Sequence, residues 1–230
     1  MNQLIVALCF SALSFSAFAQ TSNIDELKQQ ISALALENIS NVESREVVRK
    51  QLDSLISELA QVVGPVTEQT WVQFAPGGWQ QIWSDERDNS PPGAPAQDLT
   101  QIYQFISAEG WGFNFGERKV SADQSMTFAL AVVGSISGNQ QTTEITQAFF
   151  RPSGLSKGES LADLSLALRS RGRSGFDPRE AGRFPNGPIG AKGILNIQFL
   201  DHDLKIGYSP NVFTGQLELF VLRRNDFVVK

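Results

Sequence analysis

The sequence predicts a mainly β protein in which an antiparallel β-barrel is preceded by two N-terminal α-helices. Residues 24–63 place apolar side chains at the three- and four-residue spacing of a helix with one buried face. From residue 69 onward the chain changes to short runs rich in Phe, Val, Ile, Trp and Thr, separated by Gly, Asn, Pro and Asp. Helices do not alternate with strands in this half, which disfavours a parallel α/β sheet.

The first 19 residues are interpreted as a cleavable signal peptide. Leu4–Phe18 is an apolar run too short for a permanent membrane anchor, and Ala17-Phe18-Ala19 has the small-x-small pattern of a cleavage site. We therefore expect a periplasmic or secreted mature chain that begins at Gln20. Cys9 is the only cysteine and would leave with the signal, so no disulfide and no thiolate ligand are expected.

Residues 20–66 are predicted to form a helical segment ahead of a barrel domain at residues 67–230. Polar residues between Glu37 and Ser44 divide the periodic stretch into two helices. Gly64-Pro65 ends the second helix, because Gly suits the C-cap position and Pro cannot continue a helix.

Eight runs of the barrel domain have the composition of strands. They cover residues 69–84, 99–107, 111–120, 124–136, 141–151, 190–201, 203–209 and 216–224. Glu109-Gly110 and His202 lie between runs and are interpreted as hairpin turns. About eight strands with short links favour a meander closed into a barrel or a sandwich. A stiff surface loop at residues 90–95 and a long loop at residues 170–190 interrupt the meander. The segment between them at residues 161–168 fits either a short helix or a strand.

Composition and charge exclude some classes of protein. The chain is 41% hydrophobic and 19% charged, which is typical of a globular domain. Its formal net charge is −5, whereas a general nucleic-acid binder needs a basic face. Beyond the first 19 residues we expect no transmembrane segment and no nucleic-acid partner.

Polar motifs give little support for catalysis or a metal site. His202 is the single histidine, and a zinc site without Cys would then need carboxylates for nearly every ligand. Asp201-His202-Asp203 is therefore interpreted as a solvated hairpin tip. Gly154–Gly158 matches the G-x-S-x-G pattern around Ser156, but the surrounding sheet reads antiparallel, so a hairpin loop is favoured. We expect no catalytic residue, no metal and no cofactor.

Arginines gather in one stretch of this acidic protein, at Arg169, Arg171, Arg173, Arg179 and Arg183. Paired N–H donors of this kind could hold an anionic headgroup. A solvated flexible loop is the other interpretation, and both stay open.

Aromatic residues of the strands are the candidate ligand-binding set. They are Trp79, Trp83, Tyr103, Phe105, Phe113, Phe128, Phe149 and Phe199. A barrel of about eight strands is either just filled by side chains or holds one small ligand. Core filling and ligand contact are therefore the two alternatives for each ring.

Arg223 is the last candidate, because it shares one strand face with Leu217, Leu219 and Val221. If that face points inward, Arg223 lies over the Trp79 ring as a cation–π lid. The opposite face carries Arg224 and stays possible.

Five parts of the chain resemble the plastid lipid-associated proteins, also called fibrillins, in the same order, beginning with the two N-terminal helices at Leu27–Leu59. Gly77–Ser84 is similar to the family's G-x-W strand, and Ile102–Ile106, followed by Asn114, to its second and third strands. Leu195–Ile206 is similar to the family's hairpin, in which tyrosine-leucine-aspartate, one variable residue and aspartate-leucine-arginine-isoleucine follow one another, and Phe220–Leu222 is similar to its closing strand. Two departures are Lys205 in place of the usual Arg and Trp83-Ser84-Asp85 in place of a Tyr-Thr ending.

This resemblance implies a lipocalin-like β-barrel, here in a bacterial exported member, that binds a fatty acid, isoprenoid, quinone or similar lipid. The leading hypothesis is binding, storage or transport of a small hydrophobic ligand in the barrel cavity without catalysis. One alternative is an ester-type hydrolase that uses Ser156 and His202. The other is a non-catalytic module that binds a membrane surface or a partner.

Overall fold

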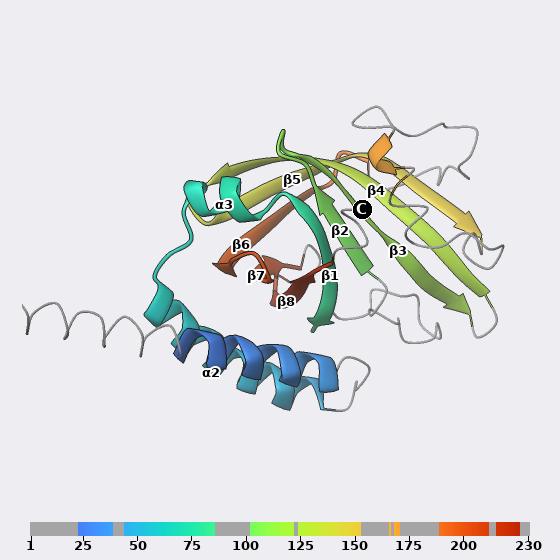
Figure 1. Cartoon of the computed structure of the whole chain (residues 1–230). Helices are drawn as coiled ribbons and strands as arrows, with labels where there is room; N and C mark the ends of the chain where they lie inside the picture. The colour runs from blue at the N-terminus through green and yellow to red at the C-terminus, as the bar shows by residue number, and fades with distance from the viewer. Residues whose placement is uncertain are drawn as a thin grey trace, which may run out of the picture.

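The computed structural model describes residues 23–38, 44–85, 102–121, 124–152, 166, 168–170, 189–211 and 215–225. Its centre is a closed antiparallel barrel in which eight strands pair in sequence order and the last strand pairs with the first (Figure 1). This confirms the fold class expected from the sequence. Several predicted features lie outside the described residues: the signal peptide, the loop at 90–95, the Ser156 motif, and residues 171–188 with their arginines.

Each strand overlaps one of the runs that have the composition of strands. They are β1 (Gly77–Ser84), β2 (Ile102–Ile106), β3 (Trp111–Ser121), β4 (Gln124–Ser137), β5 (Gln140–Pro152), β6 (Lys192–Leu200), β7 (Leu204–Pro210) and β8 (Leu217–Arg224). Gly110, in the predicted turn between β2 and β3, has φ of 82°, a conformation that glycine adopts without strain.

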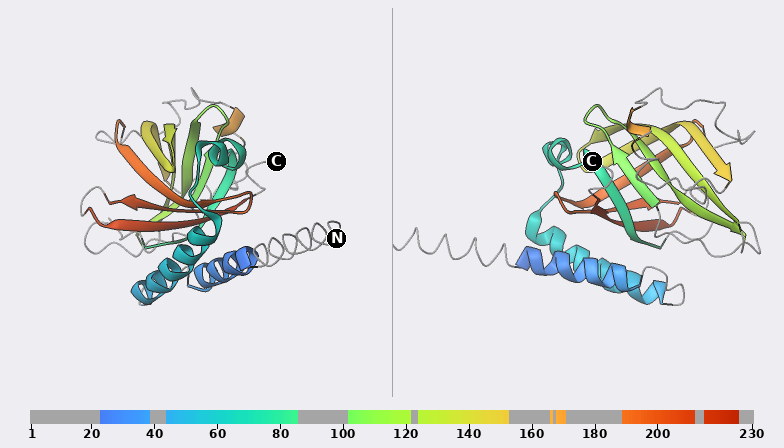
Figure 2. Two further views of the ribbon diagram at one scale, coloured as in Figure 1. Left: turned by 90° about the vertical axis from the view of Figure 1, so that its left-hand side faces the viewer. Right: turned by 45° about the vertical axis from the view of Figure 1, so that its right-hand side comes forward.

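The prediction of strand over residues 69–76 is wrong, because α3 (Glu68–Phe74) occupies most of that range. Thr67 begins this helix with a capping box, in which the Thr70 N–H donates to Thr67 Oγ1 and the Thr67 N–H donates to Thr70 Oγ1. The helix buries Trp71 against Trp79 and Ile106. Figure 2 shows α3 at one end of the barrel, and we call this end the α3 end.

The two predicted helices are present at residues 23–37 and in α2 (Arg45–Val63). They lie side by side against the outside of the barrel (Figures 1 and 2). Their apolar faces share one buried cluster with strand residues, among them Leu204, Ile206, Leu219 and Val221. Among the described residues, no helix is long and apolar enough to cross a membrane.

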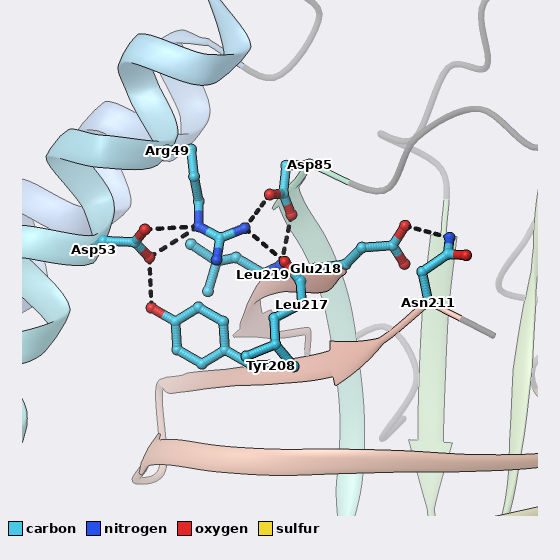
Figure 3. A network of polar contacts seen from close by, with 8 residues as sticks. All are labelled: Arg49, Asp53, Asp85, Tyr208, Asn211, Leu217, Glu218 and Leu219. Atoms are coloured by element: carbon cyan, nitrogen blue, oxygen red, sulfur yellow. Dashed lines mark hydrogen bonds and ion pairs between the residues drawn. The ribbon is translucent and has the colours of Figure 1, made fainter. Parts of the chain in front are cut away.

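A polar network fastens α2 to the barrel wall (Figure 3). The Arg49 guanidinium donates to Asp53 at 2.9 Å and to the Leu217 carbonyl at 3.1 Å, and it also pairs with Asp85 at the end of β1. The Tyr208 hydroxyl donates to Asp53 at 2.6 Å. Burial and this carboxylate raise the pKa of Tyr208. The helices are therefore held by specific contacts as well as by apolar packing.

Strand pairing decides which side chains face the barrel interior. Leu204 and Ile206 pack against the helices outside, so Lys205 between them points inward. Lys205 contacts Gln104 of β2, a strand that is not its neighbour in the barrel, and only the interior joins the two. Gln104 pairs with Trp79, and Trp79 with Arg224, so these three side chains share the inner face.

Candidate functional site

A small cavity opens at the α3 end of the barrel. Its volume is about 80 Å³, and its wall combines α3 with the inner faces of β2 to β5. Most of the wall is apolar, from Trp71, Ala75, Ile106, Val132 and Ile136. Polar groups reach it from Gln104, Gln141 and Thr143. An apolar wall with a few inward polar groups is the usual composition of a small-molecule site.

The inner polar cluster consists of four residues of the inner face, Gln81, Gln104, Asn114 and Lys205, and Gln104 connects it to this cavity. Lys205 Nζ donates to Gln104 Oε1, and Gln104 Nε2 donates to Asn114 Oδ1 at 2.9 Å. Gln104 is thus both part of the cavity wall and the hydrogen-bond partner of the lysine. Gln81 and Lys205 lie in one row of the inner face, because each pairs with Leu222.

Lys205 is fully buried, and no carboxylate among the described residues pairs with it. Its ammonium lies 4.8 Å from the centre of the Trp79 ring. Burial lowers the pKa of Lys205 well below its ordinary value, and the nearby Arg224 guanidinium lowers it further. Buried charges in proteins are normally paired, so a lone interior lysine indicates a functional role.

Arg224, rather than Arg223, lies over Trp79, with its guanidinium carbon 3.9 Å from the ring centre. It donates to the backbone carbonyls of His202 at 3.0 Å and Pro76 at 2.8 Å, and to that of Phe74. Trp79 Nε1 donates to the Ala75 carbonyl at 2.9 Å. These contacts tie α3, β1, β8 and the β6–β7 turn together at the α3 end.

The expected Arg223 lid is therefore corrected. Leu219 and Val221 pack against the outer helices, so the face that they share with Arg223 points outward. Arg223 is exposed, and its guanidinium donates to Gln80 Oε1 at 3.1 and 3.2 Å.

Arg224→Ala is expected to lower the free energy of unfolding by about 2 kcal/mol more than Arg223→Ala. Arg224 makes charge-assisted bonds to carbonyls and covers a buried ring, whereas exposed polar contacts contribute little. Urea denaturation of both variants measures the difference. Equal losses would show that the lid over Trp79 does not stabilise the barrel end.

No protein-family model matches this chain, and no curated protein is significantly similar to it. The residues themselves must therefore support any functional proposal.

The predicted aromatic residues divide between three surroundings. Trp79 faces the interior. Phe128 faces the interior as well, because successive strand residues alternate and its neighbour Ala129 packs with Phe113 on the outer face. Trp83 and Phe199 face outward and pack against the helices. Tyr103, Phe105 and Phe113 also face outward, in a cluster with Leu168. Of Phe149 the structure describes only the backbone.

Five of the eight aromatic candidates therefore fill space outside the barrel and do not line its interior. Arg169, from the predicted arginine stretch, lies 5.1 Å from the Phe105 ring on this outer surface.

Sequence reasoning missed Gln81, Gln104, Lys205 and Trp71 as site residues. Gln104 and Asn114 carried a usable signal, because each is a polar residue centred in a strand between aromatic neighbours. In a strand with both faces covered, such a polar side chain is buried and needs hydrogen-bond partners in the interior.

Asp201, His202 and Asp203 come close enough to hold a metal ion, with ligand atoms within 4.8 Å of one another. Asp201 is already occupied, because it accepts the backbone N–H groups of Asp203 and Leu204 at 2.8 Å and pairs with Lys28 at 2.5 Å. The His202 side chain is 73% exposed. The turn thus anchors the helix at residues 23–37 to the barrel.

Proposed function

We propose that this protein binds a small hydrophobic ligand inside its β-barrel and does not transform it. The observation that carries the proposal is the closed eight-stranded barrel with an apolar-walled cavity beside an inner polar cluster. A barrel of eight strands is either filled by its side chains or holds one small ligand, and the cavity favours the second case here. Fatty acids, isoprenoids and quinones share an apolar body with an oxygen-bearing end, which fits this combination.

Cavity size limits what enters the α3 end. A cavity of roughly 150 Å³ binds benzene, and this cavity holds about half of that volume. It therefore suits a short ligand or one end of a longer one. Kinship with the fibrillins and export of a chain beginning at Gln20 remain parts of this proposal. The mass of the protein purified from its source tests the cleavage after Ala19.

Tryptophan fluorescence tests the binding. Trp71 lines the cavity, so delipidated protein should give a saturable change with at least one fatty acid, quinone or isoprenoid. Val132→Phe places a larger side chain in the cavity and should abolish the fluorescence change. Val47→Phe, at an exposed helix position, should leave the fluorescence change intact. Absence of saturation with every compound would remove the proposal. Esterase activity that disappears in Ser156→Ala would favour the hydrolase alternative.

A further inference from the structure

We infer that the ligand carries a carboxylate and that Lys205 recognises it. This inference rests on the proposed function and deepens it by naming the head group. The donor and acceptor groups of the inner polar cluster, its charge and its connection to the cavity carry the argument.

Among the residues that the structure describes, hydrogen-bond donors exceed acceptors in the barrel around Lys205. An ammonium has three N–H donors, and the described contacts of Lys205 include one acceptor, Gln104 Oε1. Gln81 Nε2 is buried and has no hydrogen-bond partner among the described residues, and Gln81 lies in the same inner row as Lys205, with Leu222 between them. Trp71 Nε1, in the wall of the cavity, is also buried and has no hydrogen-bond partner in the part of the chain that the structure describes. Unused donors of this kind favour a ligand that is rich in acceptors.

Charge narrows the choice of acceptor to an anion. Among the described residues, Arg224 is the charged group that shifts the pKa of Lys205 by its electric field. Both side chains are cationic, so Arg224 disfavours the protonated lysine. Without an anion, a proton on Lys205 is repelled by Arg224, and its described partners are the Gln104 carbonyl and the Trp79 ring, neither of which carries a negative charge. A carboxylate would supply the missing charge and accept from several donors, whereas an alcohol or ketone would supply no charge.

Gln104 connects the cavity to Lys205. Its side chain forms part of the cavity wall, and its carbonyl oxygen accepts a hydrogen bond from Lys205 Nζ. A carboxylate that enters from the cavity can take the place of this oxygen, while the apolar part of the ligand stays against Ile106 and Val132. The Gln104 carbonyl oxygen thus lies where we place one oxygen of the carboxylate.

Octanoate and 1-octanol test the inference by calorimetry on the wild type, Lys205→Met and the control Lys192→Met. Lys192 is 70% exposed on β6. Lys205→Met should weaken octanoate binding at least about 30-fold, because it removes one partner of a buried charge pair. It should leave 1-octanol binding within about threefold, and Lys192→Met should change neither.

A second readout is proton uptake. A bound carboxylate raises the pKa of Lys205 again, so octanoate binding at pH 9 should take up protons. The binding enthalpy should then vary with the ionisation enthalpy of the buffer in the wild type and not in Lys205→Met. Gln81→Leu supplies an independent variant and should weaken octanoate binding about tenfold.

The outcomes separate the two proposals. Octanoate binding that is unchanged in both Lys205→Met and Gln81→Leu overturns the carboxylate inference. Equal affinity of the wild type for octanoate and 1-octanol overturns it as well and leaves barrel binding in place. A wild type that binds neither compound, nor any of the fluorescence panel, overturns the proposed function itself.

Discussion

Lys205→Met is expected to raise the free energy of unfolding at pH 7 by about 1–4 kcal/mol, because replacing a buried charge by an apolar side chain of similar size removes its desolvation cost. Lys205 is fully buried beside Arg224 and without a carboxylate among the described residues. Methionine adapts to irregular spaces and keeps contact with the Trp79 ring. A lysine that costs stability in this way fits a role in binding.

The pH dependence of the unfolding free energy also tests this cost of burying Lys205, and the lowered pKa predicts the direction of the change. The pKa of Lys205 is lowered by folding, so between the folded and unfolded values the unfolded chain binds the extra proton. The unfolding free energy of the wild type should therefore rise with pH through this window, up to about 10.5. Urea titrations from pH 7 to 10 should show that the gap between Lys205→Met and the wild type narrows.

The opposite result would assign Lys205 a different role. If Lys205→Met lowers the unfolding free energy at pH 7 and the gap does not change with pH, the lysine is a structural cation on Trp79. Lys192→Met is the control for the loss of an exposed charge and should change stability by less than about 0.5 kcal/mol.

Alternation located the strands but could not say which face points inward. Trp79 and Trp83 have the same parity, yet Trp79 faces the interior and Trp83 the helices. The register shifts between Gln81 and Trp83, and the extra residue, Ile82, reverses the faces beyond it. A bulge of this kind leaves little trace in a single sequence.

The same device separates Ile197 from Phe199. Ile197 pairs with Gly207 and belongs to the cluster at the α3 end, whereas Phe199 pairs with Ile206 and packs against the helices. Without this shift Phe199 would share the inward face of Ile197, where a ligand-binding role would need it. The helices are the second reason, because they give the outside of the barrel an apolar surface that resembles a core.

The site itself follows from closure of the barrel. Gln104 and Lys205 are 101 positions apart, and only the closed sheet brings them into contact. The resemblance had marked Lys205 as a departure from Arg, without giving it a place inside the barrel. Local patterns therefore predicted the elements, and the long-range pairing determined the chemistry of the interior.

Leu52→Ala is expected to lower the free energy of unfolding by about 2–5 kcal/mol, because it leaves a cavity between α2 and the barrel. Leu52 is fully buried in the cluster that also contains Ile206 and Val221. Val47→Ala is the matched control on the same helix, since Val47 is 61% exposed, and should change stability by less than about 0.5 kcal/mol.

The shape of the transition distinguishes an integral helical segment from a separable one. With a shared core, Leu52→Ala should shift a single unfolding transition, followed by far-UV circular dichroism and by the buried tryptophans together. A helical signal lost at lower urea than the tryptophan signal would show that residues 23–63 unfold on their own. Trp83 and Phe199 of the barrel wall are buried against the helices, and loss of the helices would expose this apolar face. We therefore expect the single transition.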